Sequence, residues 1–147
     1  MKENSQEEVS CNHRAIVNAL NKAIEIFTLH SEEAFEEVVS NGLQPVADAA
    51  GLNRIAVYRL FDKKSGRMGQ IYVWAYGKTV DLDEELVELP NVPPVIRWLD
   101  ILIKGECING NASDMPADQA AFCALFGVKS ILFVPVFTHG EFWGIVT

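Results

Sequence analysis

The sequence predicts an α+β fold, with a mostly antiparallel sheet and helices segregated around it. Helical patterns come first, a β-hairpin follows, two short helices come next, and a second hairpin ends the chain. This order is typical of antiparallel sheets rather than of alternating βαβ units. The chain has 147 residues, 49% of them hydrophobic, so one domain with a sizeable core is expected.

The N-terminal part divides near residue 13. Residues 1–12 are polar and acidic with almost no apolar anchor, which predicts a disordered tail. From residue 13 to about residue 29, apolar residues recur at spacings of three and four and predict an amphipathic helix. The residues that carry this period are Ile16, Leu20, Ala23, Ile24 and Phe27.

A second helix is expected from an N-cap at Ser31, with acidic residues in its first turn, to about residue 50. Pro45 predicts either a kink or a restart, because proline cannot donate to the carbonyl of Asn41.

The first hairpin is predicted from two short runs rich in β-branched and aromatic residues, 54–61 and 69–76. Side chains alternate between faces along a strand, and both faces of the first run are apolar. A sheet patterned in this way needs cover on both sides, which the N-terminal helices and the two later helices are expected to supply. The acidic residues within 81–88 indicate a solvated loop, since the spacing of an EF-hand calcium loop is missing.

The C-terminal half begins with a predicted helix over 94–104, started by a Pro-Pro pair and ended by Gly105. An edge strand is expected at 106–110, and residues 114–116 open a short helix that ends at Gly127. Residues 129–137 and 142–146 then read as the two strands of a hairpin.

Composition and motifs exclude several functions. Twelve basic against twenty acidic residues give a net charge of -8, which disfavours nucleic acid and anionic membranes as partners. No leader peptide or membrane span is recognisable, so a cytoplasmic location is expected. The common hydrolase, zinc-protease and phosphate-loop motifs are absent, which predicts no catalytic and no metal-binding residues.

Five segments together resemble the GAF domain, a sensory module related to PAS domains. They are residues 50–60, 103–106, 114–116, 126–136 and 140–146. The resemblance covers about residues 14–147 and implies a central antiparallel sheet of five to six strands. Long helices would lie on one face, and short helices and loops would enclose a pocket on the other.

The resemblance also implies a domain over residues 13–147 that is truncated in or just after its final strand. In such proteins the flanking helices lead to a histidine kinase or a cyclic-di-GMP enzyme. We therefore expect a bacterial signal-transduction protein of the two-component type, with the helix before the sheet pairing with its copy in a homodimer. Burial of that helix in its own core is the alternative.

Three expected ligand contacts share one strand face in the first hairpin, and four others come from elements that the family places around its pocket, although simple core packing would also explain all seven. Asp114 is expected either at the pocket mouth or as an N-cap. The full set is Tyr58, Tyr72, Trp74, Trp98, Asp114, Phe122, Phe126 and Phe133.

Comparison with the known ligands of the family does not identify the ligand of this chain or any cofactor. Bilin attachment is not expected, because Asp118 and Gln119 stand where bilin-binding members carry Cys-His. The predicted function is a non-enzymatic sensor of a small molecule, and the alternative is a ligand-free dimerisation and relay domain. Cys107 and Cys123 raise a third reading, a thiol enzyme similar to methionine-sulfoxide reductases, but their surroundings do not match that branch.

Overall fold

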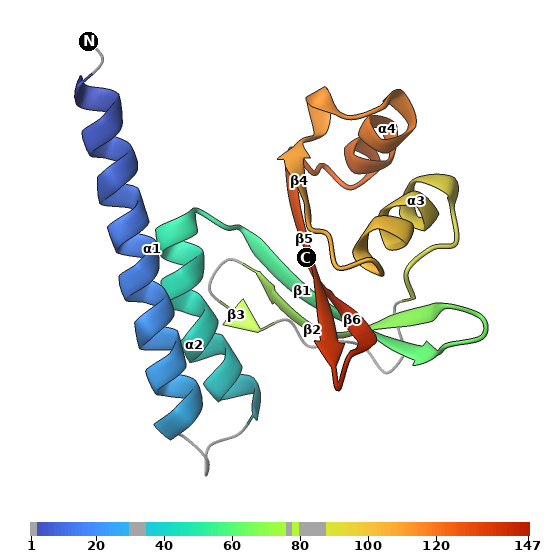
Figure 1. Ribbon diagram of the computed structural model, residues 1–147, viewed down its shortest axis with the longest axis horizontal. Coiled ribbons are helices and arrows are strands. Elements are labelled where there is room, and N and C mark those ends of the chain that lie inside the picture. The colour runs from blue at the N-terminus through green and yellow to red at the C-terminus, as the bar shows by residue number, and fades with distance from the viewer. Residues whose placement is uncertain (1–2, 30–34, 76–77, 80–87) are drawn as a thin grey trace. The chain divides into compact units, whose positions relative to one another are not determined.

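The computed structural model describes residues 3–29, 35–75, 78–79 and 88–147 (Figure 1). The chain divides into two compact units. The first unit comprises Met1–Arg54 with Trp74–Val80, and the second comprises Ile55–Val73 with Asp81–Thr147.

The first unit is built on a pair of helices, α1 (Glu3–Leu29) and α2 (Phe35–Ala50), which lie side by side in Figure 1. Small residues allow them to approach closely: Ala23 on α1 and Ala47 on α2 are 4% and 1% exposed. A Cβ built on Gly42 would lie 2.4 Å from Cζ of Phe27, so the contact leaves no room for a side chain unless the phenyl ring moves.

Helix α1 begins ten residues earlier than the sequence predicted. Residues 3–12, expected to form a disordered tail, are the first turns of α1. The segment contains neither proline nor glycine, and its acidic residues favour the positive end of the helix dipole. Extending an existing helix requires no new nucleation, so an anchored α1 can continue through polar sequence.

Helix α2 runs through Pro45 without a restart. The side chain of Gln44 donates a hydrogen bond to Asp48 across this turn, with Nε2 and Oδ1 2.8 Å apart. The N-cap predicted at Ser31 lies outside the described residues.

The sheet has six strands in the order β3-β2-β1-β6-β5-β4, which confirms the predicted strand number and the α+β class. The pairs β1–β6, β2–β3, β4–β5 and β5–β6 are antiparallel. The strands are β1 (Arg54–Asp62), β2 (Arg67–Ala75), β3 (Lys78–Thr79), β4 (Ile108–Asn111), β5 (Ser130–Thr138) and β6 (Glu141–Val146). Both predicted hairpins form, and β4 is an edge strand as expected.

Gly144 explains how β6 fits against β1. In the β1–β6 register Tyr58 pairs with Ile145 and Arg59 with Gly144. A Cβ built on Gly144 would lie only 2.2 Å from the carbonyl oxygen of Tyr58. The absence of a side chain at Gly144 therefore lets the backbone of β1 approach this closely.

Two helices and a short 3-10 turn of the second unit pack on the sheet: α3 (Pro93–Leu102), η1 (Ala112–Asp114) and α4 (Ala117–Leu125). Figure 1 shows α3 and α4 on the same side of β5. They enclose a core that contains Trp98 and Leu102 from α3, Cys123 from α4 and Ile145 from β6. Cover of the opposite face by the N-terminal helices stays a prediction.

Candidate ligand site

An aromatic group in the second unit brings together four of the predicted ligand residues. Trp98 of α3 meets Phe122 of α4 at a ring-centroid distance of 5.7 Å and Phe133 of β5 at 5.2 Å. Both contacts are edge-to-face, the arrangement that aromatic quadrupoles favour. Phe126 extends the group, with its ring 5.2 Å from that of Phe122. We call Trp98, Phe122, Phe126 and Phe133 the aromatic cluster.

Trp98 carries the polar atom of this cluster. Its side chain is 4% exposed, and its indole Nε1 has no hydrogen-bond partner among the described residues. A buried donor without an acceptor costs about 1–3 kcal/mol. Since native structures rarely leave such groups unsatisfied, this one requires a specific explanation.

Gln70 is a buried polar residue that the sequence analysis missed. It is only 4% exposed, and its Nε2 donates a hydrogen bond to the hydroxyl of Tyr58 over 3.0 Å. Tyr58 packs against the core that contains Trp98. The available signal was alternation: Gln70 stands between Met68 and Tyr72 on the buried face of β2, where a polar side chain needs a partner.

Tyr72 and Trp74 are core residues of β2, at 5% and 2% exposed. Trp74 belongs to the first compact unit, and Tyr72 belongs to the second. Like Trp98, Trp74 has a buried Nε1 without a partner in the described part of the chain. Their contact with a ligand stays a prediction.

Asp114 does not act as the N-cap of α4, so that expectation was wrong. The cap position is Pro116, which has no side-chain cap hydrogen bond, because η1 ends at Asp114 before the helix starts. The exposed Asp114 carboxylate accepts hydrogen bonds from Asn111 Nδ2 and Ser113 Oγ instead. It therefore orders the turn between β4 and α4.

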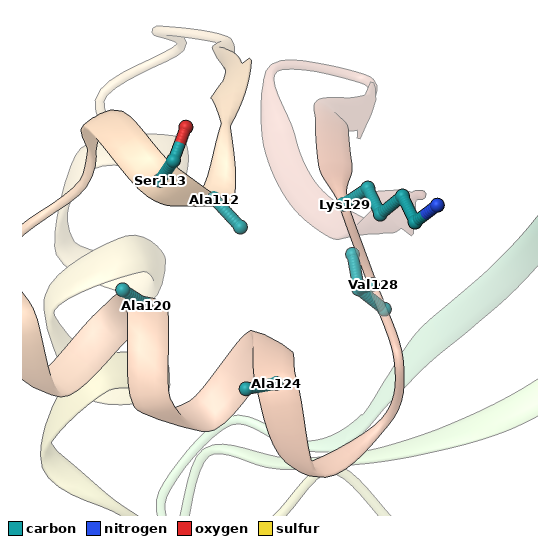
Figure 2. Close-up of a pocket in the computed structure, with 6 residues that line it drawn as sticks. All are labelled: Ala112, Ser113, Ala120, Ala124, Val128 and Lys129. Atoms are coloured by element: carbon teal, nitrogen blue, oxygen red, sulfur yellow. The ribbon is translucent and has the colours of Figure 1, made fainter.

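A surface hollow of about 400 Å³ lies between η1, α4 and the start of β5 (Figure 2). Figure 2 shows Ser113 and Lys129 pointing their polar ends away from the alanines, so the interior is apolar. The lining residues are Ala112, Ser113, Ala120, Ala124, Val128 and Lys129. None of the eight predicted ligand residues lines this hollow, but Ala112 and Val128 also belong to the core around Trp98.

Charged groups stay at the surface of this unit. Asp118 forms an exposed ion pair with Arg97, across the contact between α4 and α3. The described residues contain no group of three acidic, histidine or cysteine side chains that could hold a metal ion. None of the described helices combines the length and the apolar composition that a membrane span requires.

The two cysteines of the C-terminal half differ in environment. Cys107 is exposed and Cys123 is buried, and both are free thiols. Burial raises the pKa of the Cys123 thiol above its ordinary value. A raised pKa keeps the side chain in the unreactive thiol form, which does not suit a nucleophile.

The fold and this site define a class: an α+β domain with helices that cover an aromatic core on one face of an antiparallel sheet. Within that class, the chain belongs to the GAF family, whose sequence model, described as "GAF domain", matches residues 34–147. The recognition from sequence is therefore confirmed.

Solved structures show the same fold. The phycocyanobilin-bound GAF domain from a cyanobacterial phytochrome is 17% identical, with a TM-score of 0.62 over 89% of this chain and 77% of that one. The A. aeolicus nlh2 GAF domain in an inactive state is 14% identical, with a TM-score of 0.62 over 92% of this chain and 78% of that one.

One relative of this chain is named as a histidine kinase. The methanogenesis regulatory histidine kinase FilI of Methanothrix harundinacea (strain 6Ac) is 31% identical over 81 residues. The match covers 54% of this chain but only 9% of the relative.

Proposed function

We propose that this chain is the sensory part of a signalling protein and binds a small molecule at the aromatic cluster. The observation that carries the proposal is the meeting of Trp98, Phe122 and Phe133, which come from three different elements. A molecule held among them would contact α3, α4 and β5 together. Its binding free energy would therefore depend on how these elements are arranged.

Signalling would follow from a shift between two arrangements of the domain. A ligand changes the output only if it binds one arrangement more tightly than the other. Tyr58 adds a link across the sheet, because it packs on the core and pairs with Ile145 of β6. A change at the cluster would thus reach β1 and β6.

The chain itself would not be an enzyme. The buried Cys123 has a raised pKa and His139 lies in the exposed turn between β5 and β6, so neither offers an activated nucleophile or base. The output would be a separate domain inside the cell, and the histidine kinase relative supports a phosphotransfer output.

The protein would act as a homodimer through α1. Three apolar residues of this helix follow the three-four spacing of a coiled-coil seam, whereas the ring of Phe27 lies against Gly42 of α2. Each of the three is at least 46% exposed: Val17, Leu20 and Ile24. The smaller Ala19 and Ala23 are buried, so the exposed residues form a second apolar face.

The second candidate function is a ligand-free dimerisation and relay domain. It is favoured by the close ring contacts of Trp98, because aromatic side chains that pack edge-to-face fill space that a ligand would otherwise occupy.

Native mass spectrometry of the freshly purified chain tests the two functions together. The sensor predicts a small-molecule adduct that disappears on denaturation. It also predicts loss of the adduct in a Trp98→Ala, Phe133→Ala double variant, but not in Trp143→Ala, which changes a ring outside the cluster. Unliganded dimer in every preparation would favour the relay and contradict the sensor.

A further inference from the structure

The buried Trp98 indole is oriented by its neighbours. Phe122 and Phe133 meet it edge-to-face, at interplanar angles of 72° and 80°. Rotating the indole about its side-chain bonds would break both contacts, so the direction of the Nε1–H bond is fixed by packing.

No side chain of the surrounding core offers a ready acceptor for this donor. The buried members of the core are aliphatic, aromatic or sulfur-containing: Met68, Val95, Trp98, Leu102, Ala112, Cys123 and Ile145. Gln70 is the one buried polar residue of the described chain, and its amide nitrogen donates to the hydroxyl of Tyr58. A phenylalanine at position 98 would fill the same layer without burying a donor.

We infer that the Trp98 indole N–H is the hydrogen-bond donor for the ligand, and that the ligand is a small uncharged molecule with an apolar body and a hydrogen-bond acceptor such as a carbonyl oxygen. This inference rests on the proposed function and names its ligand class.

The chemistry of the core selects this class. An N–H group pairs only with an acceptor, which a carbonyl oxygen provides and an ammonium group or a hydrocarbon does not. The ion pair nearest in sequence, Arg97 with Asp118, is exposed and already matched. A carboxylate or an ammonium group would therefore lose its hydration in the core without gaining a counter-charge. The apolar hollow shares Ala112 and Val128 with this core and offers a side from which the molecule can enter.

The test compares three probes of the same ring on the full chain: acetophenone, ethylbenzene and benzoate. Acetophenone and ethylbenzene share a carbon skeleton and differ by the carbonyl, and benzoate adds a charge. Binding is followed by the ¹H–¹⁵N resonances of the three tryptophan indoles. Trp74→Phe and Trp143→Phe variants assign the Trp98 signal.

Acetophenone is expected to move the Trp98 indole proton downfield and to bind at least about fivefold more tightly than ethylbenzene, the effect of one ordinary hydrogen bond. Benzoate is expected not to bind. In Trp98→Phe the two neutral probes are expected to bind within about twofold of each other. Trp143→Phe, which changes a half-buried tryptophan of β6 outside the aromatic cluster, serves as the matched control and keeps the preference.

Equal binding of the two neutral probes to the unaltered protein would overturn the role of Trp98 and leave a small-molecule site in place. A preference that survives in Trp98→Phe would overturn it too. If neither neutral probe binds, the inferred ligand class is wrong. The sensor function is then tested separately, by whether native mass spectrometry detects an endogenous adduct. If Trp98→Phe does not fold, the role of Trp98 is tested by the unaltered protein alone, through the shift of its Trp98 indole resonance on addition of acetophenone.

Discussion

Among the described glycines, position 144 is the one where an added side chain would make the shortest contact with its surroundings. In Gly144→Ala the new Cβ would meet the Tyr58 carbonyl oxygen at 2.2 Å, and backbone rather than a flexible side chain must move. We expect a loss of about 3 kcal/mol in the free energy of unfolding, the upper part of the range for overpacking. Urea denaturation measures it.

Gly140→Ala is the matched control, because it adds the same methyl group where nothing lies within 4 Å. Its backbone φ of +80° makes alanine strained, so a loss of about 1 kcal/mol is expected from conformation alone. Similar losses in both variants would mean that β1 and β6 do not approach as closely as described.

Cys123 supplies a prediction about reactivity. Burial raises the pKa of its thiol, whereas Cys107 is exposed. Iodoacetamide at pH 8 should alkylate Cys107 in the folded protein and reach Cys123 only after unfolding. Peptide mass spectrometry distinguishes the two sites. Rapid labelling of Cys123 in the folded state would revive the thiol-enzyme reading.

The start of β2 is fixed by an ion pair with the segment that precedes α3. The guanidinium of Arg67 forms a hydrogen-bonded ion pair with the carboxylate of Glu88. The backbone N–H of Leu89 donates a hydrogen bond to the carbonyl of Met68 over 2.9 Å. The hydrogen bond from Arg67 and then its charge hold the pKa of Glu88 below the ordinary value near 4.5. The ion pair is exposed, so salt should weaken it.

A lowered carboxyl pKa gives a defined pH dependence. The contribution of Glu88 to stability is complete well above pH 4.5 and is lost as pH falls through its folded-state pKa. We therefore expect the difference in unfolding free energy between the unaltered protein and Glu88→Gln to shrink from pH 6.5 to about pH 3. Lys64→Gln, which removes an exposed charge of the β1–β2 turn, is the control. A difference independent of pH would contradict the ion pair.

At the level of elements, the sequence predicted most where local signals are strong. The β5–β6 hairpin and α3 formed as expected, since β-branched runs and a Pro-Pro start are local features. The predicted start of α1 and the predicted N-cap of α4 were wrong. In both cases composition described single residues correctly, but the extension of a neighbouring helix or turn decided their structure.

The site was less predictable than the fold. The family resemblance predicted the four residues of the aromatic cluster as ligand contacts, and this stays a prediction. The pairing of Gln70 with Tyr58 depends on the register between β1 and β2, which no local pattern records. Three of the six residues that line the hollow are alanines, and these carry no chemical signal in a sequence. Its position results from how η1, α4 and β5 pack.

At the scale of the whole molecule, α1 has two apolar faces of different character. Small residues such as Ala19 and Ala23 are buried, while the larger Leu20 and Ile24 are 46% and 60% exposed. Large apolar side chains in a heptad spacing are suited to a second copy of the helix. The charged side chains of Lys22 and Glu25 fall outside the seam, so like charges would not meet within it.

This arrangement predicts how the dimer responds to substitution. Leu20→Gln with Ile24→Gln should convert the protein to a monomer at about 50 μM in light-scattering chromatography, because polar side chains remove the seam's apolar surface. The matched control is Asn18→Gln with Lys22→Gln, an exposed pair with the same spacing on another face of α1, which should remain dimeric. If the unaltered chain is itself a monomer, or if both pairs act alike, α1 is not the dimer interface. In that case a signal from the aromatic cluster would have to leave the domain by a route other than a paired helix.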